Sequence, residues 1–406
     1  MELPVLAGRA AARRRPVVRQ VPAGRPEPGG RPDREVPPGP ADRWGAVAQL
    51  GPAEQPGPED RRALAVPKAR AAPPAQAGPL AVRDRPGRGL ATSTRQRVFP
   101  AWQLTARFAL YAAYTGPLYQ VRNGSNTKNI PVGADGYVKI SEQDSFCSGA
   151  QCTISIIYDQ SPNKNDLPKT PDTLWLKSAN ANEAFATDGK LTIKGHTAYG
   201  IYDNNSFSHT RDVGYRNNNC KGVAKDDEPE SMYMVVDGKR YSQWCCFDYG
   251  NVSSTGLADG PGTMEAIYWG TSTQFSKGGV GTGPWVLADL EYGMFGCETV
   301  TTACATNTTV TADFVTTMLK GPSGNLFGLK AGNAQSGKLE TKWDGKRPAG
   351  GYAPKKLGGQ IVLGTGGDGS NTGVGTFWEG AMTKGNPPST VDDDVQANIV
   401  AAGYGK

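Results

Sequence analysis

Short runs of alternating apolar and polar residues follow one another from about residue 105 onward, separated by turns rich in Gly, Asn, Asp and Pro. A period of two is that of a strand with one buried face, and no long helical periodicity interrupts the pattern. We therefore expect an all-β fold, an antiparallel β-sandwich of the jelly-roll type. The expected strands are residues 152–158, 232–236, 263–269, 285–291, 314–319, 360–364 and 375–382.

One short helix is predicted at the C-terminal end. Val391, Val395 and Ile399 recur at i, i+4 and i+8, so they share one helix face. Thr390 is placed to cap this helix, and the acids of residues 392–394 fall in its first turn, where the helix dipole favours negative charge. We expect this helix to serve packing alone.

Residues 1–102 are a different kind of sequence. They hold 18 of the 31 prolines and much Arg, Ala and Gly, but no Cys, Tyr, Ile or Asn. Such a segment buries too little apolar surface to offset its chain entropy, so we expect disorder, or coding sequence read from a wrong start or frame. A basic tail that binds polyanions is the alternative. No apolar stretch of about 7–15 residues follows Met1, so no signal peptide is visible. The folded domain is expected at residues 103–406.

The net charge of +6 is unevenly placed. The first 100 residues hold 18 Lys and Arg against 9 Asp and Glu, so the remainder carries a net charge of −3. A mildly acidic folded part does not favour nucleic acid as a partner. No apolar run approaches the ~18 residues of a membrane span, so we also expect no membrane partner.

All seven cysteines follow residue 146, and six of them lie in close pairs. Zinc binding is disfavoured, because there is no CxxC pair and the chain has only two histidines. Disulfides in an oxidising compartment are the better interpretation, and four sequons agree with a secreted, extracellular glycoprotein. The pairs are Cys147 with Cys152, Cys245 with Cys246, and Cys297 with Cys304, with Cys220 left over; the sequons begin at Asn123, Asn204, Asn251 and Asn307.

Two carboxylates stand at i and i+2 in the predicted strand 285–291. On one strand face, Asp289 and Glu291 would lie about 6.6 Å apart, close enough to titrate at separate pKa values, as a catalytic pair requires. Trp285 on the same face would suit the C–H face of a sugar ring. The alternative is an ordinary exposed strand face. The acids of residues 226–230, Glu265 and residues 392–394 are weaker catalytic candidates.

Ten collinear segments between residues 105 and 406 closely resemble the catalytic domain of glycoside hydrolase family 54, the secreted, mostly fungal α-L-arabinofuranosidases. Its adjacent cysteine pair is rare and makes the resemblance specific. The segments include Ile156-Ile-Tyr-Asp-Gln-Ser, Gly214-Tyr-Arg-Asn-Asn, Cys245-Cys-Phe-Asp-Tyr-Gly-Asn, Met264-Glu-Ala-Ile-Tyr, Gly283-Pro-Trp, Gly366-Gly-Asp and Gln396-Ala-Asn-Ile-Val-Ala-Ala.

The resemblance implies a concanavalin-like sandwich and the release of terminal arabinofuranose from arabinoxylan and arabinan with retention of anomeric configuration. It implies that Glu291 is the nucleophile and Asp368 the general acid/base. Asp289 and Gly367 match residues that line the sugar pocket. Cys245 and Cys246 match a vicinal disulfide on which the sugar ring packs.

This sequence departs from the family at two predicted sugar contacts. Phe275 stands where a stacking Trp is expected, and Tyr292 stands where an Asn commonly follows the nucleophile. Cys297 and Cys304 look like a pair special to this chain. We expect a monomer that acts on an arabinose-containing polysaccharide or oligosaccharide and needs no cofactor or metal. A β-xylosidase-leaning specificity and a non-catalytic arabinose-binding, lectin-like module are the alternatives.

Overall fold

The computed structural model describes residues 102–105, 110, 114–171, 181–204, 213–257, 259–274, 276–370 and 373–406. The predicted low-complexity segment 1–102 therefore lies outside the described residues, except for Trp102, which begins the first strand.

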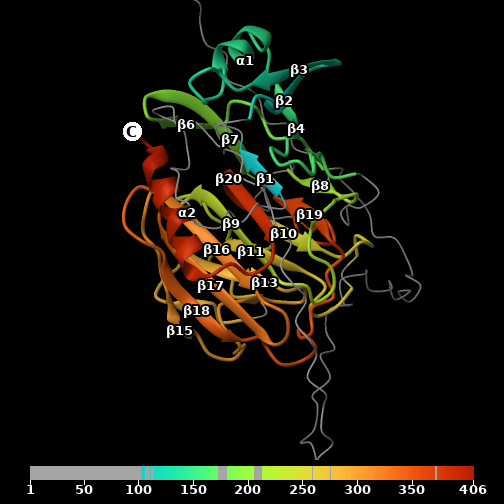
Figure 1. Cartoon of the computed structure of the whole chain (residues 1–406), viewed down its shortest axis with the longest axis vertical. Coiled ribbons are helices and arrows are strands. Elements are labelled where there is room, and N and C mark those ends of the chain that lie inside the picture. Colours follow the sequence, from blue (N-terminus) through green and yellow to red (C-terminus); the bar gives the residue numbers. More distant parts are fainter. Residues whose placement is uncertain are drawn as a thin grey trace, which may run out of the picture. The chain divides into compact units, whose positions relative to one another are not determined.

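The larger of the two main sheets has eight strands in the order β18-β17-β16-β9-β20-β7-β6, with β1 paired to β20. All its pairings are antiparallel. Figure 1 shows β16, β9 and β20 side by side in this sheet. Its strands are β1 (Trp102–Thr105), β6 (Gly189–Ile193), β7 (His196–Asn204), β9 (Glu230–Asp237), β16 (Phe314–Gly321), β17 (Leu326–Asn333), β18 (Glu340–Lys346) and β20 (Val374–Lys384).

The second main sheet has six strands in the order β14-β13-β11-β10-β19-β8, again all antiparallel. Its strands are β8 (Tyr215–Asn217), β10 (Asp248–Val252), β11 (Glu265–Gly270), β13 (Trp285–Asp289), β14 (Met294–Phe295) and β19 (Gln360–Leu363).

The two sheets pack face to face around one large core. Ile267, Val286 and Ala288 of the six-stranded sheet join Val235 and Leu319 of the eight-stranded sheet in this core. The predicted antiparallel β-sandwich is thereby confirmed.

The opposite face of the six-stranded sheet, which we call the outer face, carries two smaller buried clusters. Because side chains alternate along a strand, Trp285 and Leu287 lie on the outer face while Val286 and Ala288 enter the core, as the period of two predicted. The clusters are Val252, Met264, Ala266 and Val362, and Tyr268, Trp285, Leu287 and Met294.

Smaller elements complete the described chain. A four-stranded sheet contains β2 (Pro117–Asn123), β3 (Asn126–Pro131), β4 (Thr153–Ile157) and β5 (Leu167–Pro168), and β12 (Gly279–Val280) pairs in parallel with β15 (Cys304–Thr308). A disulfide between Cys147 and Cys152 joins the end of α1 (Ile140–Phe146) to the start of β4. Another joins Cys297 to Cys304. Cys220 is half-buried and outside any disulfide.

Each of the seven predicted strands is present, with ends that move by a few residues. The important difference is in strand 285–291, which ends at Asp289. Glu291 and Tyr292 have φ values of 62° and 59°, so the chain is already turning there. The expectation that the pleat of one strand places both Asp289 and Glu291 is therefore wrong.

The predicted C-terminal helix is α2 (Ser389–Ala402), but its expected cap is wrong. Pro388 is the N-cap residue, without a side-chain cap hydrogen bond, and Thr390 lies inside the helix. Asp392 instead accepts hydrogen bonds from Lys320 Nζ at 2.6 Å and Lys330 Nζ at 2.7 Å. These two ion pairs hold α2 against β16 and β17, beside which it lies in Figure 1.

Candidate active site

Three segments that are distant in the sequence meet on the outer face. They are β10 with the Cys245–Cys246 pair just before it, the turn after β13, and the loop after β19. β10 and β13 are both antiparallel to β11, so the start of β10 and the end of β13 lie at opposite ends of these short strands. The loop after β19 folds back over the outer face, where a Cβ on Gly367 would lie 2.9 Å from Glu291 and 3.4 Å from Val252. The outer face thereby gathers most of the residues that the family resemblance implied.

The turn after β13 presents Glu291. Leu290 N–H donates to the Gly293 carbonyl at 3.1 Å, which closes the β13–β14 hairpin. Glu291 N–H donates to Asp289 Oδ1 at 2.9 Å. Both side chains are largely buried, with exposed fractions of 9% for Glu291 and 7% for Asp289. The turn therefore keeps the two acids together after the strand has ended.

The loop after β19 brings Asp368 to the same place. Gly366 N–H donates to the Ser370 carbonyl at 2.9 Å, and Ser370 N–H donates to Asp368 Oδ1 at 2.8 Å. A Cβ on Gly367 would lie 2.9 Å from Glu291 Oε2, and one on Gly366 would lie 3.1 Å from Cys246 Sγ. A side chain at either glycine would therefore force the Glu291 carboxylate or the Cys246 sulfur to shift, so glycine favours the close approach of the loop.

Cys245 and Cys246 are joined in a vicinal disulfide. Their Sγ atoms and one carboxylate oxygen from each of Asp248 and Asp289 all lie within 4.8 Å of one another. The disulfide is therefore an apolar wall beside the Asp289 carboxylate. A ring formed by adjacent residues closes almost no chain, so its value lies in shape more than in stability.

The clustered acids disturb one another's titration. Burial raises the pKa of Glu291 to about 9, and the charges of Asp289 and Asp368 add to the rise, while the cation of Arg216 opposes it. Burial also raises the pKa of Asp289 to about 7. Near neutral pH the cluster consequently retains a proton, which a general acid requires.

Sequence reasoning missed three groups that support these acids. Arg216 is buried and donates from Nη1 to the Gly367 carbonyl at 2.5 Å. Tyr352 donates its hydroxyl to the Tyr292 carbonyl at 3.0 Å. The third group is Asp248, which is wholly buried on β10. Arg216 and Asp248 lie inside segments that carry the family resemblance, but no local pattern distinguishes them from ordinary strand residues.

Two predicted sugar contacts, Tyr292 and Phe275, remain to be considered. Tyr292 is 47% exposed, so its ring is accessible at the edge of the turn. Phe275 lies outside the described residues.

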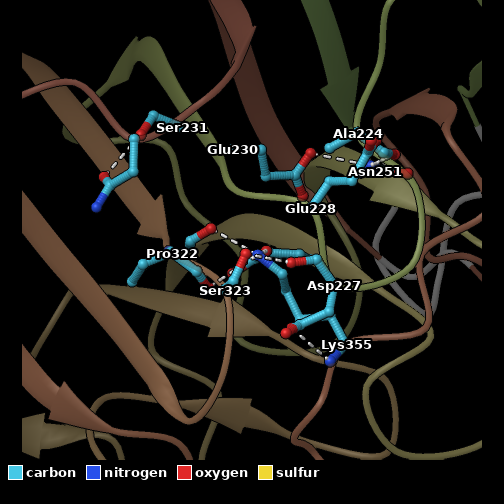
Figure 2. Close-up of polar contacts among 12 residues, drawn as sticks. Ala224, Asp227, Glu228, Glu230, Ser231, Asn251, Pro322, Ser323 and Lys355 are labelled. Carbon is cyan, nitrogen blue, oxygen red and sulfur yellow. Dashed lines mark hydrogen bonds and ion pairs between the residues drawn. The ribbon is translucent and has the colours of Figure 1, made fainter. Parts of the chain in front are cut away.

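The competing acids have structural partners. Glu265 is buried on the core side of β11 and pairs with Arg347 and with Lys355, the latter at 3.3 Å. Figure 2 shows Glu230 beside Asn251, whose Nδ2 donates to it at 2.9 Å. In the same view, Asp227 accepts the backbone N–H of Lys355 at 3.1 Å. These acids hold loops and strands together, and Glu265 lies on the opposite face of the sheet from Asp289.

Two of the four predicted glycosylation sites are buried. The side-chain amides of Asn251 and Asn307 are hydrogen-bonded inside the protein, the latter to the Val286 carbonyl at 2.8 Å. A glycan on either amide would require the surrounding strands to open, so the expectation is wrong at these two positions. Asn204 is exposed at the end of β7, and Asn123 ends β2.

No helix among the described residues has both the length and the apolar character needed to cross a membrane.

Comparison with known proteins gives one consistent result. The profile of the family described as alpha-L-arabinofuranosidase B, catalytic, matches residues 99–405. Alpha-L-arabinofuranosidase B of Emericella nidulans is 45% identical over 304 residues, which are 73% of this chain and 58% of that protein. An arabinofuranosidase/β-xylosidase of Trichoderma koningii is 44% identical over 302 residues, covering 73% and 59%. The chain thus spans less than two thirds of the curated relatives it matches.

Solved structures agree with the sequence comparison. A crystal structure of an arabinofuranosidase complexed with arabinofuranosyl-α-1,2-xylobiose superposes with a TM-score of 0.70 at 38% identity, over 75% of this chain and 63% of that one. A family 54 α-L-arabinofuranosidase soaked with a cyclic sulfate inhibitor has the same TM-score and coverage at 39% identity.

Proposed function

The chain belongs to the α-L-arabinofuranosidase B catalytic family, and we propose that it is a retaining, exo-acting α-L-arabinofuranosidase. Its substrates are terminal arabinofuranose units on arabinoxylan or arabinan. The observation that carries this proposal is the meeting of Glu291, Asp289 and Asp368 beside the Cys245–Cys246 disulfide. A site that only bound sugar would not need two closely coupled acids.

In the first step, Glu291 attacks the anomeric carbon as the glycosidic bond breaks, and Asp368 gives its proton to the leaving oxygen. Glu291 must then be ionised and Asp368 protonated. The negative charge of Asp368 is one cause of the raised pKa of Glu291. Placing the proton on Asp368 therefore favours the ionised, nucleophilic form of Glu291.

In the second step, Asp368 takes a proton from water, and the resulting nucleophile displaces Glu291 from the arabinosyl intermediate. Two inversions give overall retention. For this scheme we expect a carboxyl separation of about 5–5.5 Å in the substrate complex, against about 6.5–9.5 Å for an inverting enzyme.

Recognition of the sugar is assigned to the groups around these acids. Asp289 accepts a hydrogen bond from a ring hydroxyl, and the disulfide packs on the apolar face of the ring. Gly367 leaves the ring space beside Glu291, where a Cβ would lie only 2.9 Å from the carboxylate. Tyr292, exposed next to the nucleophile, contacts the sugar or the chain from which it is cleaved.

The proposal is tested by turnover of nitrophenyl α-L-arabinofuranoside, with the anomer of the first product followed by NMR. We expect hydrolysis with retention. Release of the β anomer as the first product would exclude retention, and binding of arabinose without turnover would favour the lectin-like alternative.

A second activity, hydrolysis of β-xylosides, is supported by the name of the Trichoderma koningii relative, which joins both activities. Nitrophenyl β-xyloside is the matching assay. Turnover of the xyloside above that of the arabinoside would reverse the order of the two activities.

We further propose that residues 103–406 form one catalytic domain and that the protein works outside the cell. The three disulfides among the described residues support an oxidising compartment. Asn123 and Asn204 are the sequons left for glycosylation, and mass shifts after glycosidase treatment of the secreted protein test this.

A further inference from the structure

Among the residues that the structure describes, Asp248 is the one wholly buried acid of the outer face, and nothing in the proposed reaction uses it. It lies on β10 on the same face as Asp289 of β13, with β11 between the two strands. Asp289 is in register with Ala266 of β11, which is in turn in register with Gly250 of β10. Because both are small, the two carboxyl groups can meet across the strand.

One carboxylate oxygen of Asp248 and one of Asp289 lie within 4.8 Å of each other, so the two buried groups face each other at close range. Among the described residues, no N–H or O–H group donates to either oxygen of Asp248. Two ionised carboxylates in contact would repel each other strongly in a buried place. At least one proton must therefore lie between them.

The partners of Asp289 indicate where the proton resides. Asp289 Oδ1 accepts the backbone N–H of Glu291 at 2.9 Å, which stabilises its ionised form. Asp248 has no such donor and is 0% exposed, against 7% for Asp289. The lower-energy arrangement is a neutral Asp248 whose O–H donates to an ionised Asp289.

The electrostatic surroundings agree with this arrangement. Burial raises the pKa of Asp248 well above its ordinary value, and the charges of Asp289, Glu291 and Asp368 add to the rise. From β11 the buried phenol of Tyr268 faces the same region, and it donates to the carbonyls of Ser242 and Trp244. The cation of Arg216 acts on Asp368 and Glu291.

We propose that Asp248 is a positioning residue, a buried neutral acid that donates a hydrogen bond to Asp289 and holds that side chain ionised and oriented to accept a sugar hydroxyl. This inference rests on the proposed function, because it assigns Asp289 to sugar recognition. It predicts that Asp248 acts through its proton and not through negative charge.

Two variants separate the donor from the charge. Asp248→Asn keeps a donor towards Asp289, whereas Asp248→Leu keeps the approximate size and removes the donor. We expect kcat/KM of Asp248→Leu to fall by roughly 10- to 100-fold, the range for losing a hydrogen bond to a charged group. Asp248→Asn should retain a much larger share of the wild-type kcat/KM. Because the donor lowers the pKa of Asp289, the acid limb of the kcat/KM profile should move to higher pH in Asp248→Leu and stay close to its original position in Asp248→Asn.

Infrared spectroscopy observes the proton directly and needs no substrate. At neutral pH, the difference spectrum of the wild type minus Asp248→Asn should contain the carbonyl band of a buried carboxylic acid, because the bands of the other protonated acids are common to both proteins and cancel. In Asp289→Asn the amide can donate to Asp248, so Asp248 can ionise and the same band should weaken. This reciprocal variant keeps the test available if an Asp248 variant fails to fold.

Asp392→Asn is the matched control, because Asp392 is also buried but pairs with Lys320 and Lys330. It should lower the melting temperature and leave kcat/KM and the acid band unchanged. Equal kinetics for Asp248→Asn and Asp248→Leu would overturn the proposal. A wild-type-minus-Asp248→Asn difference spectrum without that band, or activity lost in chelator and restored by calcium, would overturn it as well. Wild-type turnover of the arabinoside reports separately on the proposed function, so either can fail alone.

Discussion

Gly367→Ala tests whether the close approach of the loop after β19 to Glu291 is needed for catalysis. Gly367 does not adopt a left-handed backbone conformation, so alanine fits its backbone without strain. The added Cβ would lie 2.9 Å from Glu291 Oε2, and 3.4 Å from both Met264 Sδ and Val252 Cγ1. The last two distances are ordinary contacts. The Glu291 carboxylate alone has to move.

The expected magnitudes follow from those distances. A side-chain end that shifts by a few tenths of an ångström costs little stability, and Gly→Ala itself stabilises by about 0.4–1 kcal/mol through the unfolded chain. We therefore expect the free energy of unfolding to change by less than about 1 kcal/mol. Misplacement by about 1 Å can cost about 100-fold in rate, so a shift of a few tenths of an ångström should cost less, but the methyl group also takes space from the sugar. We expect kcat/KM to fall by roughly 10- to 100-fold.

The assay is initial-rate turnover of nitrophenyl α-L-arabinofuranoside, with the thermal midpoint measured on the same samples. Gly328→Ala on β17 is the matched control, because its Cβ would lie 3.4 Å from the Trp343 carbonyl oxygen, an ordinary contact. It should leave both quantities nearly unchanged. If Gly367→Ala is as active as the wild type, the loop is not packed against a working nucleophile, and the assignment of Glu291 is wrong.

Four further variants test the other assigned groups. Glu291→Gln removes the attacking charge, so turnover should fall at least about 1,000-fold while arabinose still binds in calorimetry; near-normal turnover would move the role elsewhere. Asp368→Asn should spare the first step with activated nitrophenyl leaving groups and be rescued by azide, whereas uniform loss without rescue would contradict the acid/base role. Replacing Cys245 and Cys246 by Ala should raise KM with little change in melting temperature; a loss of about 1–3 kcal/mol of stability with normal kinetics would make them core residues only. Arg216→Met removes a cation that lowers the pKa of Glu291, so the pH range in which Glu291 is ionised, read from kcat/KM, should move upward, and an unmoved profile would refute this role.

The strands that were predicted correctly from the sequence point successive side chains to opposite faces, and both of those faces are buried. In β13, Val286 and Ala288 enter the core while Trp285 and Leu287 cover the outer face. The period of two and the apolar character of the strand could therefore both be recognised in the sequence. β18 was not predicted, because it is an edge strand whose seven residues are mostly polar and exposed. Its pairing with β17 depends on the tertiary structure, and the residues of β18 alone do not indicate it.

The buried charges were the least predictable part. Asp392 has the sequence signature of an acid in a helix first turn, yet its partners Lys320 and Lys330 come from β16 and β17. Glu265 looked like a catalytic candidate, and only the fold reveals Arg347 and Lys355 around it. An isolated acid in a sequence carries no information on what will surround it, so family resemblance, and not local pattern, led to Asp368.

The Glu291–Tyr292 turn explains why strand periodicity failed where the chemistry begins. A two-residue hairpin turn with both central residues in the left-handed region ordinarily takes Asn and Gly. Here Glu291 and Tyr292 adopt φ values of 62° and 59°, a conformation that costs roughly 1–2 kcal/mol for each such residue. The turn is held by the hydrogen bonds from Glu291 N–H to Asp289 Oδ1 and from Tyr352 to the Tyr292 carbonyl. A local cost that surrounding contacts offset is a frequent mark of a functional site. The strain therefore supports a functional role for the Glu291–Tyr292 turn independently of its match to the family.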